Sequence, residues 1–101
     1  DPSVFRAAVS DVPTLVPLFD AYRVFYGFSS DPDLAAGFLH ERLSSGESVI
    51  FFSPEASTGL PAGFVQLYPS FSSLSADRIW ILNDLYVTPP ARRRGIARAL
   101  I

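Results

Sequence analysis

The chain of 101 residues lacks cysteine and contains a single histidine. The absence of cysteine excludes disulfides, thiolate metal ligands and a cysteine nucleophile. One histidine argues against a metal site built on histidine ligands, so we expect no metal. Long apolar runs are absent too: none approaches the roughly 20 residues that a membrane-spanning helix needs, and the first residues do not resemble a signal peptide. We therefore expect a soluble, cytoplasmic protein without a membrane partner.

Lysine is also missing, so all eight basic residues are arginines, and they are unevenly placed. Four of them, Arg92, Arg93, Arg94 and Arg98, lie in the last ten residues, which contain no acidic residue. The rest of the chain is acidic. A compact basic segment suits a small anionic ligand, whereas a nucleic-acid surface usually needs a broad basic face. Because no aromatic residue is interleaved with these arginines, we expect no nucleic-acid partner.

The composition, 49% hydrophobic and 18% charged, is that of a globular chain, and its length allows one domain. Residues 4–9 (VFRAAV) have the pattern of a first strand. Ser10 is a candidate N-cap for a helix that runs to Gly27, with a kink or break expected at Pro17, where a backbone hydrogen bond is lost. Asp31-Pro32 marks the start of a second helix, which Gly46 ends.

From Ser48 the hydrophobic pattern becomes that of strands. We expect strands at residues 49–52 and 62–68, paired as an antiparallel hairpin, then a polar loop at 69–76 and a strand at 79–87. A helix opens near Gly95. The predicted order is β-α-α-β-β-β-α, an α/β fold with a mixed, mostly antiparallel sheet.

The apolar run at residues 79–87 has the pattern of a strand that is buried on both faces, and such a strand is expected in the centre of a sheet. Nothing after it in the chain could pair with its free edge. Because an uncovered apolar edge is an aggregation hazard, we expect this chain to be part of a longer protein, or to be completed by a second copy as a homodimer.

Two polar residues, Asn83 and Asp84, interrupt this strand. One interpretation is a two-residue hairpin turn, but Asn-Asp is a weaker turn pair than Asn-Gly or Asp-Gly. The favoured interpretation is a continuous strand with a β-bulge. A bulged strand leaves backbone groups that a linear, amide-containing ligand could pair with. Partly removed from water, Asp84 would be a candidate general base.

The arginine-rich turn after the double proline has the pattern R-x-x-G-x-A at a helix start. Gly95 and Ala97 lack bulk, so a diphosphate could approach the backbone amides closely, and arginine side chains could fork onto its oxygens. The pattern predicts a site for a phosphate-bearing cofactor. A solvated basic turn without a ligand is the alternative.

The segment LNDLYVTPPARRRGIARALI resembles the acetyl-CoA motif of the GNAT superfamily of N-acetyltransferases. The order of elements is also similar, so the resemblance covers residues 1–101 as a single, incomplete domain whose C-terminal part, from within the third helix, is missing. It implies the GNAT fold and direct transfer of an acetyl group from acetyl-CoA to a primary amine of a small molecule or a lysine side chain. A CoA-binding module without catalysis, or a transferase of another acyl group, are the alternatives.

The resemblance also implies roles for particular residues. Leu85, Tyr86 and Val87 would pair with the pantetheine arm. Arg92 would add charge to a diphosphate held by the backbone amides of Arg93, Arg94, Gly95, Ile96, Ala97 and Arg98. Asp84, or Asn83 through an ordered water, would act as the base, although many members carry Glu near Asn83. Tyr26 would contact the amine. The family's usual tyrosine acid lies in a later helix, beyond Ile101.

Overall fold

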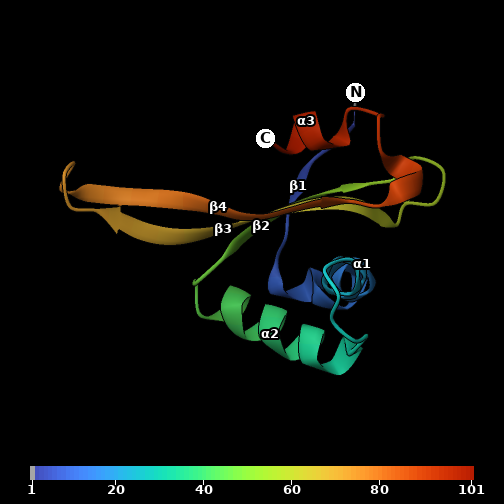
Figure 1. Cartoon of the computed structure of the whole chain (residues 1–101), viewed down its shortest axis with the longest axis horizontal. Coiled ribbons are helices and arrows are strands. Elements are labelled where there is room, and N and C mark those ends of the chain that lie inside the picture. The colour runs from blue at the N-terminus through green and yellow to red at the C-terminus, as the bar shows by residue number, and fades with distance from the viewer. Residues whose placement is uncertain (1) are drawn as a thin grey trace.

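The computed structural model describes residues 2–101. Four strands form one sheet in the order β1-β2-β3-β4, and every pairing within the described residues is antiparallel. Helices α1 and α2 cover one face and α3 lies on the other (Figure 1). The predicted order of elements is confirmed. The bounds are β1 Phe5–Arg6, α1 Val12–Phe25, α2 Pro32–Ser44, β2 Val49–Pro54, β3 Pro61–Ser72, β4 Asp77–Val87 and α3 Ile96–Leu100, with 3-10 turns at Val9–Asp11 and Pro89–Ala91.

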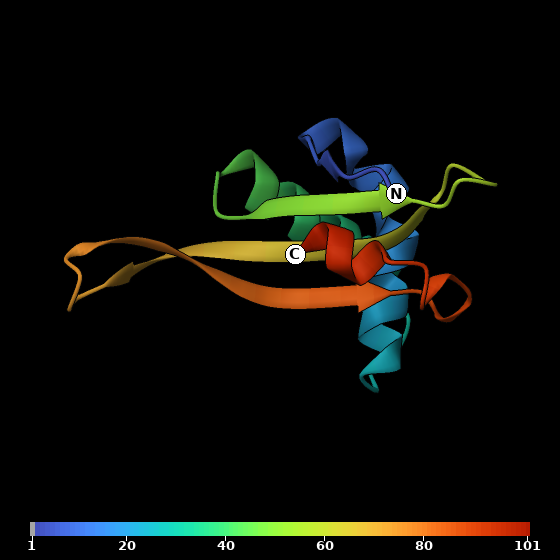
Figure 2. The ribbon, with the colours of Figure 1, turned by 90° about the horizontal axis from the view of Figure 1, so that it is seen from above.

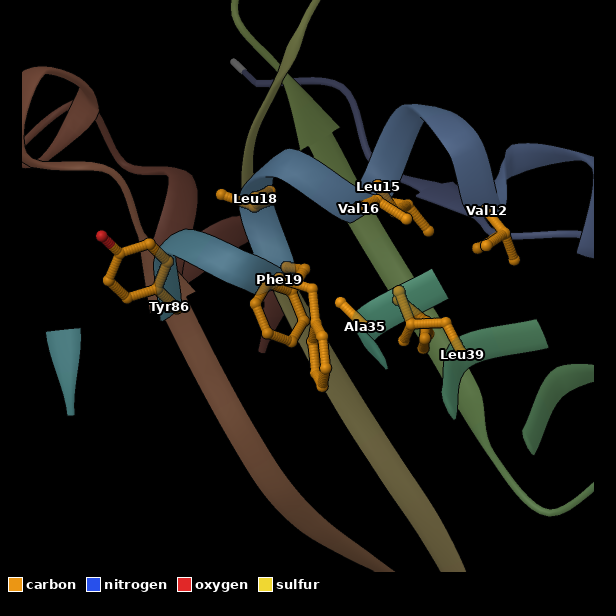
Figure 3. Packing of buried hydrophobic residues seen from close by; sticks show 11 residues of the cluster. Val12, Leu15, Val16, Leu18, Phe19, Ala35, Leu39 and Tyr86 are labelled. Carbon is orange, nitrogen blue, oxygen red and sulfur yellow. The ribbon is translucent and has the colours of Figure 1, made fainter. Parts of the chain in front are cut away.

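Two apolar clusters hold the layers together. The larger lies between α1, α2 and the sheet, and comprises Ala7, Val12, Leu15, Val16, Leu18, Phe19, Ala35, Leu39, Ile50, Phe64 and Tyr86. In Figure 3 the side chains of α1 lie beside Ala35 and Leu39 of α2, with Tyr86 at the end of the cluster away from Val12. The smaller cluster joins α3 to the other face through Ala62, Val65, Val87, Ala91, Ile96 and Leu100.

Helix α1 is continuous through Pro17, so of the kink or break expected there the break is wrong. Proline removes only the bond from its own nitrogen to the carbonyl four residues earlier. Val16 and Leu18, on either side of it, are buried in the larger cluster, and this packing keeps the helix intact. Helix α2 begins as predicted, because Asp31 accepts a hydrogen bond from the Leu34 amide and Pro32 is the first helical residue.

The first strand is shorter than the six residues expected, because only Phe5–Arg6 pairs with β2. The chain then turns: the Ala8 amide donates to Asp11 Oδ2 at 2.7 Å, and a 3-10 turn follows. Asp11, rather than Ser10, is the residue that precedes α1. A side-chain bond to the backbone thus replaces the sheet ladder over the last residues of the predicted strand.

The loop expected at residues 69–76 is wrong, because β3 and β4 stay paired as far as Ser72 and Asp77. The turn occupies only residues 73–76, where Ala76 adopts φ +52°. We call the outer part of this hairpin, residues 69–82, the arm; it extends beyond the helices (Figure 2). Along it Trp80 pairs with Pro69, and the Arg78 guanidinium lies over the Phe71 ring.

The burial predicted for the strand at 79–87 is also wrong over its first half. Residues 79–82 are 39–57% exposed, and within residues 2–101 β4 lies at the edge of the sheet rather than in its centre. The helices cover β4 only near Asp84 to Val87, which are more buried than the residues before them. Among the described residues no helix is long and apolar enough to span a bilayer.

Candidate active site

The bulge expected at Asn83 and Asp84 is confirmed. Gln66 of β3 pairs with Asp84 and the next residue, Leu67, pairs with Leu82, so Asn83 is an extra residue on β4. The strand runs on through this point, and the alternative of a hairpin turn is wrong. A bulge re-aims the side chains that follow it. Here it accompanies a buried carboxylate on the sheet face that α1 covers, because Tyr22 of α1 contacts Asp84.

Asp84 is 7% exposed and accepts three hydrogen bonds. They come from the Tyr22 hydroxyl at 2.6 Å, the Gln66 side-chain amide at 2.8 Å and the Asn83 side-chain amide at 3.1 Å. Gln66 is fully buried, and its carbonyl accepts a 2.6 Å bond from Ser48 Oγ. Three donors satisfy most of the roughly four acceptor positions of a carboxylate and leave one for a ligand.

Sequence reasoning missed Tyr22 and Gln66 as partners of Asp84, and Ser48 as the partner of Gln66. One signal was available: Gln66 is a polar residue inside the apolar strand AGFVQLY. Such a residue is stable in a sheet only when it is hydrogen-bonded. Its partner on the neighbouring strand could not be inferred, because the bulge changes the register by one residue.

The two tyrosines near Asp84 are held in their neutral form. Burial, together with the hydrogen bond to Asp84 and its negative charge, raises the pKa of Tyr22. Burial and the charge of Asp84 raise the pKa of Tyr68. At neutral pH the Tyr22 hydroxyl therefore keeps its proton and donates the hydrogen bond that orients the carboxylate.

A cavity of about 650 Å³ lies next to this network. Its described lining is mostly aromatic and comes from α1, α2, the segment between them and the two strands: Phe19, Tyr22, Arg23, Tyr26, Phe28, Leu34, Ala35, Phe38, Tyr68 and Asp84. We call it the acceptor cavity, after the amine acceptor that the family resemblance implies. A mostly apolar hollow with a few polar groups is typical of a small-molecule site.

A second cavity, of about 470 Å³, lies beside the arginine-rich turn. The structure brings together nine of the ten residues predicted to bind the cofactor, and we call this the cofactor cavity. Its described lining is Phe25, Tyr26, Leu85, Tyr86, Val87, Ala91, Arg92, Arg93, Gly95, Ile96, Ala97 and Arg98. Arg94 is the exception: it lies outside, with Nη1 3.6 Å from Glu55 Oε1.

The turn before α3 has an unusual backbone. Arg93 and Gly95 both adopt left-handed conformations, with φ +68° and +79°. A non-glycine residue in this region is strained, and such strain is concentrated at functional sites. Among the backbone hydrogen bonds of residues 2–101, none is donated by residues 93–98. Free amides at a helix start are suited to an anion.

Gly63 of β3 sets the distance between α3 and the sheet. A Cβ atom there would lie 2.7 Å from Ile96 Cγ2 and 3.2 Å from Val87 Cγ2. Only glycine allows this close approach, which places the first residues of α3 beside the end of β4. Sequence reasoning did not single out this glycine.

The side chain of Arg92 makes contacts within the protein, unlike an arginine whose guanidinium is free to bind phosphate. Its Nε donates a 2.9 Å hydrogen bond to the carbonyl of Val87, and its guanidinium lies 5.2 Å from the Phe25 ring and 5.7 Å from the Tyr86 ring. The Val87 carbonyl, expected to pair with the pantetheine arm, therefore already accepts a bond. Arg92 holds the end of β4 and lines the cofactor cavity at the same time.

Tyr26 lies where the two cavities adjoin, because it lines both. Its ring contacts those of Tyr22 and Phe25 edge to face, with centroids 5.2 Å apart in each case. It is 63% exposed. The predicted amine contact thus stands between the cavity that contains Asp84 and the cavity beside the arginines. Within residues 2–101, no group of three His, Asp or Glu side chains could hold a metal ion.

Comparison with known proteins identifies the family. Residues 15–101 match the family described as "Acetyltransferase (GNAT) family". The chain belongs to the GNAT acetyltransferases. It is 46% identical over 99 residues to "Uncharacterized N-acetyltransferase YhfO" of Bacillus subtilis (strain 168), and 37% identical over 98 residues to a "Probable acetyltransferase" of Haemophilus influenzae. A solved structure, "Crystal structure of a probable acetyltransferase", is similar with a TM-score of 0.89 and 46% identity.

These matches cover nearly all of this GNAT chain but only part of each relative. They include 98% and 97% of the chain for the two sequences, against 65% and 66% of the relatives' own lengths, and 97% against 65% for the structure. The chain thus spans about two thirds of the proteins it matches. The GNAT fold expected from the sequence is confirmed over that part.

Proposed function

We propose that the protein is an acetyl-CoA-dependent N-acetyltransferase that acts on a primary amine, on a small molecule or a lysine side chain. One observation carries the proposal. Two cavities adjoin at Tyr26, one beside a basic turn with free amides and the other beside a buried, hydrogen-bonded carboxylate. Membership of the GNAT family favours acetyl-CoA as the donor.

The residues of the cofactor cavity fit CoA. The amides of residues 93–98 and the side chains of Arg93 and Arg98 would bind the diphosphate, and space is available because nothing lies within 4 Å of a Cβ placed on Gly95. Leu85, Tyr86 and Val87 would line the path of the pantetheine arm. When bound, acetyl-CoA supplies the thioester whose acetyl group is transferred.

Asp84 is the residue best placed to handle the proton of the amine. The nitrogen lone pair would form the new bond to the acetyl carbon as the carbon–sulfur bond breaks, CoA would leave as a thiolate that takes up a proton, and the amine would lose one. Asp84 would accept the amine proton, with Tyr22 and Gln66 holding the carboxylate in position. Asn83, adjacent on the bulge, would do so only through an ordered water. Tyr26 would orient the amine between the two cavities.

The test uses the full-length protein, acetyl-CoA and a panel of primary amines that includes lysine peptides. Release of the CoA thiol, measured with a thiol-reactive dye, and the acetylated product, measured by mass spectrometry, are expected together. Calorimetry with CoA separates the alternatives. Binding without turnover on any amine would indicate a CoA-binding module, and turnover only with another acyl-CoA would indicate a different acyl group. Absence of binding would overturn the proposal. Cytoplasmic location and a homodimer stay predictions.

A further inference from the structure

The acceptor cavity contains an arginine whose charge nothing described so far uses. Arg23 lies in the last turn of α1 and lines the cavity together with Asp84. Its guanidinium lies over the ring of Phe28, 5.1 Å from the ring centroid. Its Nη1 is buried and has no hydrogen-bond partner. A buried N–H group without a partner is rare in folded proteins and calls for an explanation.

The nearby acid on the same helix does not satisfy this group. Asp20 precedes Arg23 by one turn, but both of its oxygens are engaged elsewhere. Oδ2 accepts a 2.6 Å bond from Ser30 Oγ, and Oδ1 accepts a 2.8 Å bond from the Asp31 amide. None of the ion pairs formed within residues 2–101 includes Arg23. Arg23, which lines the cavity, therefore has hydrogen-bonding capacity that none of the described residues uses.

Of the ten described residues that line the cavity, Arg23 and Asp84 are the charged ones. The other eight are aromatic or aliphatic. The cavity thus offers one cationic and one anionic group on an apolar wall. A guanidinium recognises a carboxylate through two parallel N–H···O bonds, and an arginine fixed against an aromatic ring loses little freedom in doing so.

We infer that the acceptor is an amine that also carries a carboxylate and an apolar or aromatic body, and that Arg23 binds the carboxylate while the amine faces Asp84. An amino acid with an apolar side chain has this chemistry. The inference rests on the proposed function. Besides the hydrogen bond from Ser30, the charge of Arg23 already helps to lower the pKa of Asp20. Asp84 lies in the same cavity, so the site suits a monoanionic carboxylate better than a phosphate dianion.

The experiment compares acceptors that differ only by the carboxylate, such as phenylalanine with phenethylamine and leucine with isoamylamine. Arg23→Gln is expected to raise KM for the amino acids by about 10- to 100-fold, the range for losing hydrogen bonds to a charged group. It should leave kcat, and KM for the simple amines, nearly unchanged. Arg23→Lys should recover part of the loss, because it keeps the charge without the fork. Arg6→Gln, at an exposed position on β1, is the control.

A second measurement does not depend on turnover. Binding of N-acetylphenylalanine, which retains the carboxylate but has no basic amine, is measured by calorimetry on the wild type and on Arg23→Gln. The wild type should bind it at least tenfold more tightly. Equal binding, an equal rise in KM for both acceptor classes, or a preference for phosphoethanolamine would overturn the inference. Transfer to simple amines with no role for Arg23 would overturn it while leaving the acetyltransferase proposal standing.

Discussion

The Tyr22 hydroxyl donates a 2.6 Å hydrogen bond to Asp84 Oδ1, joining residues that are 62 positions apart in the chain. This bond links α1 to the bulge in β4. It fixes one wall of the acceptor cavity, because both residues line it. The rings of Phe64 and Tyr86 pack against Tyr22, so the hydroxyl is held in place from several sides.

The first prediction concerns the proposed role of Asp84 as the general base, which is tested by removing its negative charge. Asp84→Asn should lower kcat by about 10²- to 10⁴-fold, the usual contribution of a positioned general base. The affinity for acetyl-CoA should stay within a few-fold of the wild type, because Asp84 does not line the cofactor cavity. Steady-state kinetics and calorimetry measure the two quantities. Asp33→Asn, an exposed position in the first turn of α2, is the control. Equal turnover in Asp84→Asn would remove this residue as the base.

The raised pKa values of Tyr22 and Tyr68 predict how the stability of the protein changes at alkaline pH. The pKa of Tyr22 is raised above the ordinary value of 10.0 by burial and by Asp84, and that of Tyr68 is raised by burial and by the Asp84 charge. Their contribution to the free energy of unfolding is therefore complete below about pH 10. It is lost as pH rises above that value, because the unfolded chain ionises first. Urea unfolding at pH 8 to 11 should show this decline.

The matched variant for that experiment is Tyr22→Phe. At neutral pH its free energy of unfolding should be lower by about 1.5–3 kcal/mol, the range for a hydrogen bond to a charged group. Its decline above pH 10 should be shallower than that of the wild type, with Tyr68 accounting for what is left. A variant that follows the wild-type curve throughout would show that the Tyr22–Asp84 bond contributes nothing to stability.

A carboxylate introduced at the turn before α3 tests whether the cofactor cavity binds the phosphates of CoA. Gly95→Asp should weaken CoA binding about tenfold or more, because the added charge would lie beside the amides proposed to bind phosphate. Gly95→Asn is the control, since it has nearly the same size and adopts the left-handed conformation about as well. Calorimetry with CoA should find Gly95→Asn much closer to the wild type. Equal losses in both variants would mean that shape rather than charge decides binding.

A substitution at Gly63 tests whether the missing side chain at this position allows α3 to pack closely against the sheet. Gly63→Ala places a methyl 2.7 Å from Ile96 Cγ2, and it should lower the free energy of unfolding by about 1–3 kcal/mol and weaken CoA binding as α3 shifts. In the double variant with Ile96→Ala, the loss should be smaller than the sum of the single losses, because the clash is relieved. Gly37→Ala in α2 has nothing within 4 Å and should not destabilise. Strict additivity of the two changes would argue against the contact.

The exposed apolar residues of the arm lead to a prediction about self-association. Ile79, Trp80, Ile81 and Leu82 are each more than a third exposed on a strand at the edge of the described sheet. Expressed by itself, the 101-residue chain should self-associate in sedimentation experiments, because such a strand is a template for pairing. A double change of Ile79 and Ile81 to Lys should reduce association, and Ser45→Lys, in the turn after α2, should not. A stable monomer at high concentration would contradict this prediction.

Local sequence patterns were enough to predict much of the secondary structure of this protein. The hydrophobic periods predicted the order of the elements, and the Asn-Asp pair inside an apolar strand predicted the bulge. The R-x-x-G-x-A pattern indicated a phosphate site at the turn, and the resemblance to the GNAT motif named the residues that, except for Arg94, line one cavity. These features depend on neighbours within a few positions, where period, turn chemistry and capping operate.

Contacts between distant segments were decided only in the folded chain. The bonds from Tyr22 and Gln66 to Asp84 and the ion pair of Arg94 with Glu55 depend on which strands and helices pack together. The same holds for Arg23 Nη1, which is buried without a hydrogen-bond partner. The true length of the hairpin arm was also decided only in the folded chain. A one-residue shift of register changes which side chains share a face, and the order of residues along the chain does not encode that shift in any local pattern.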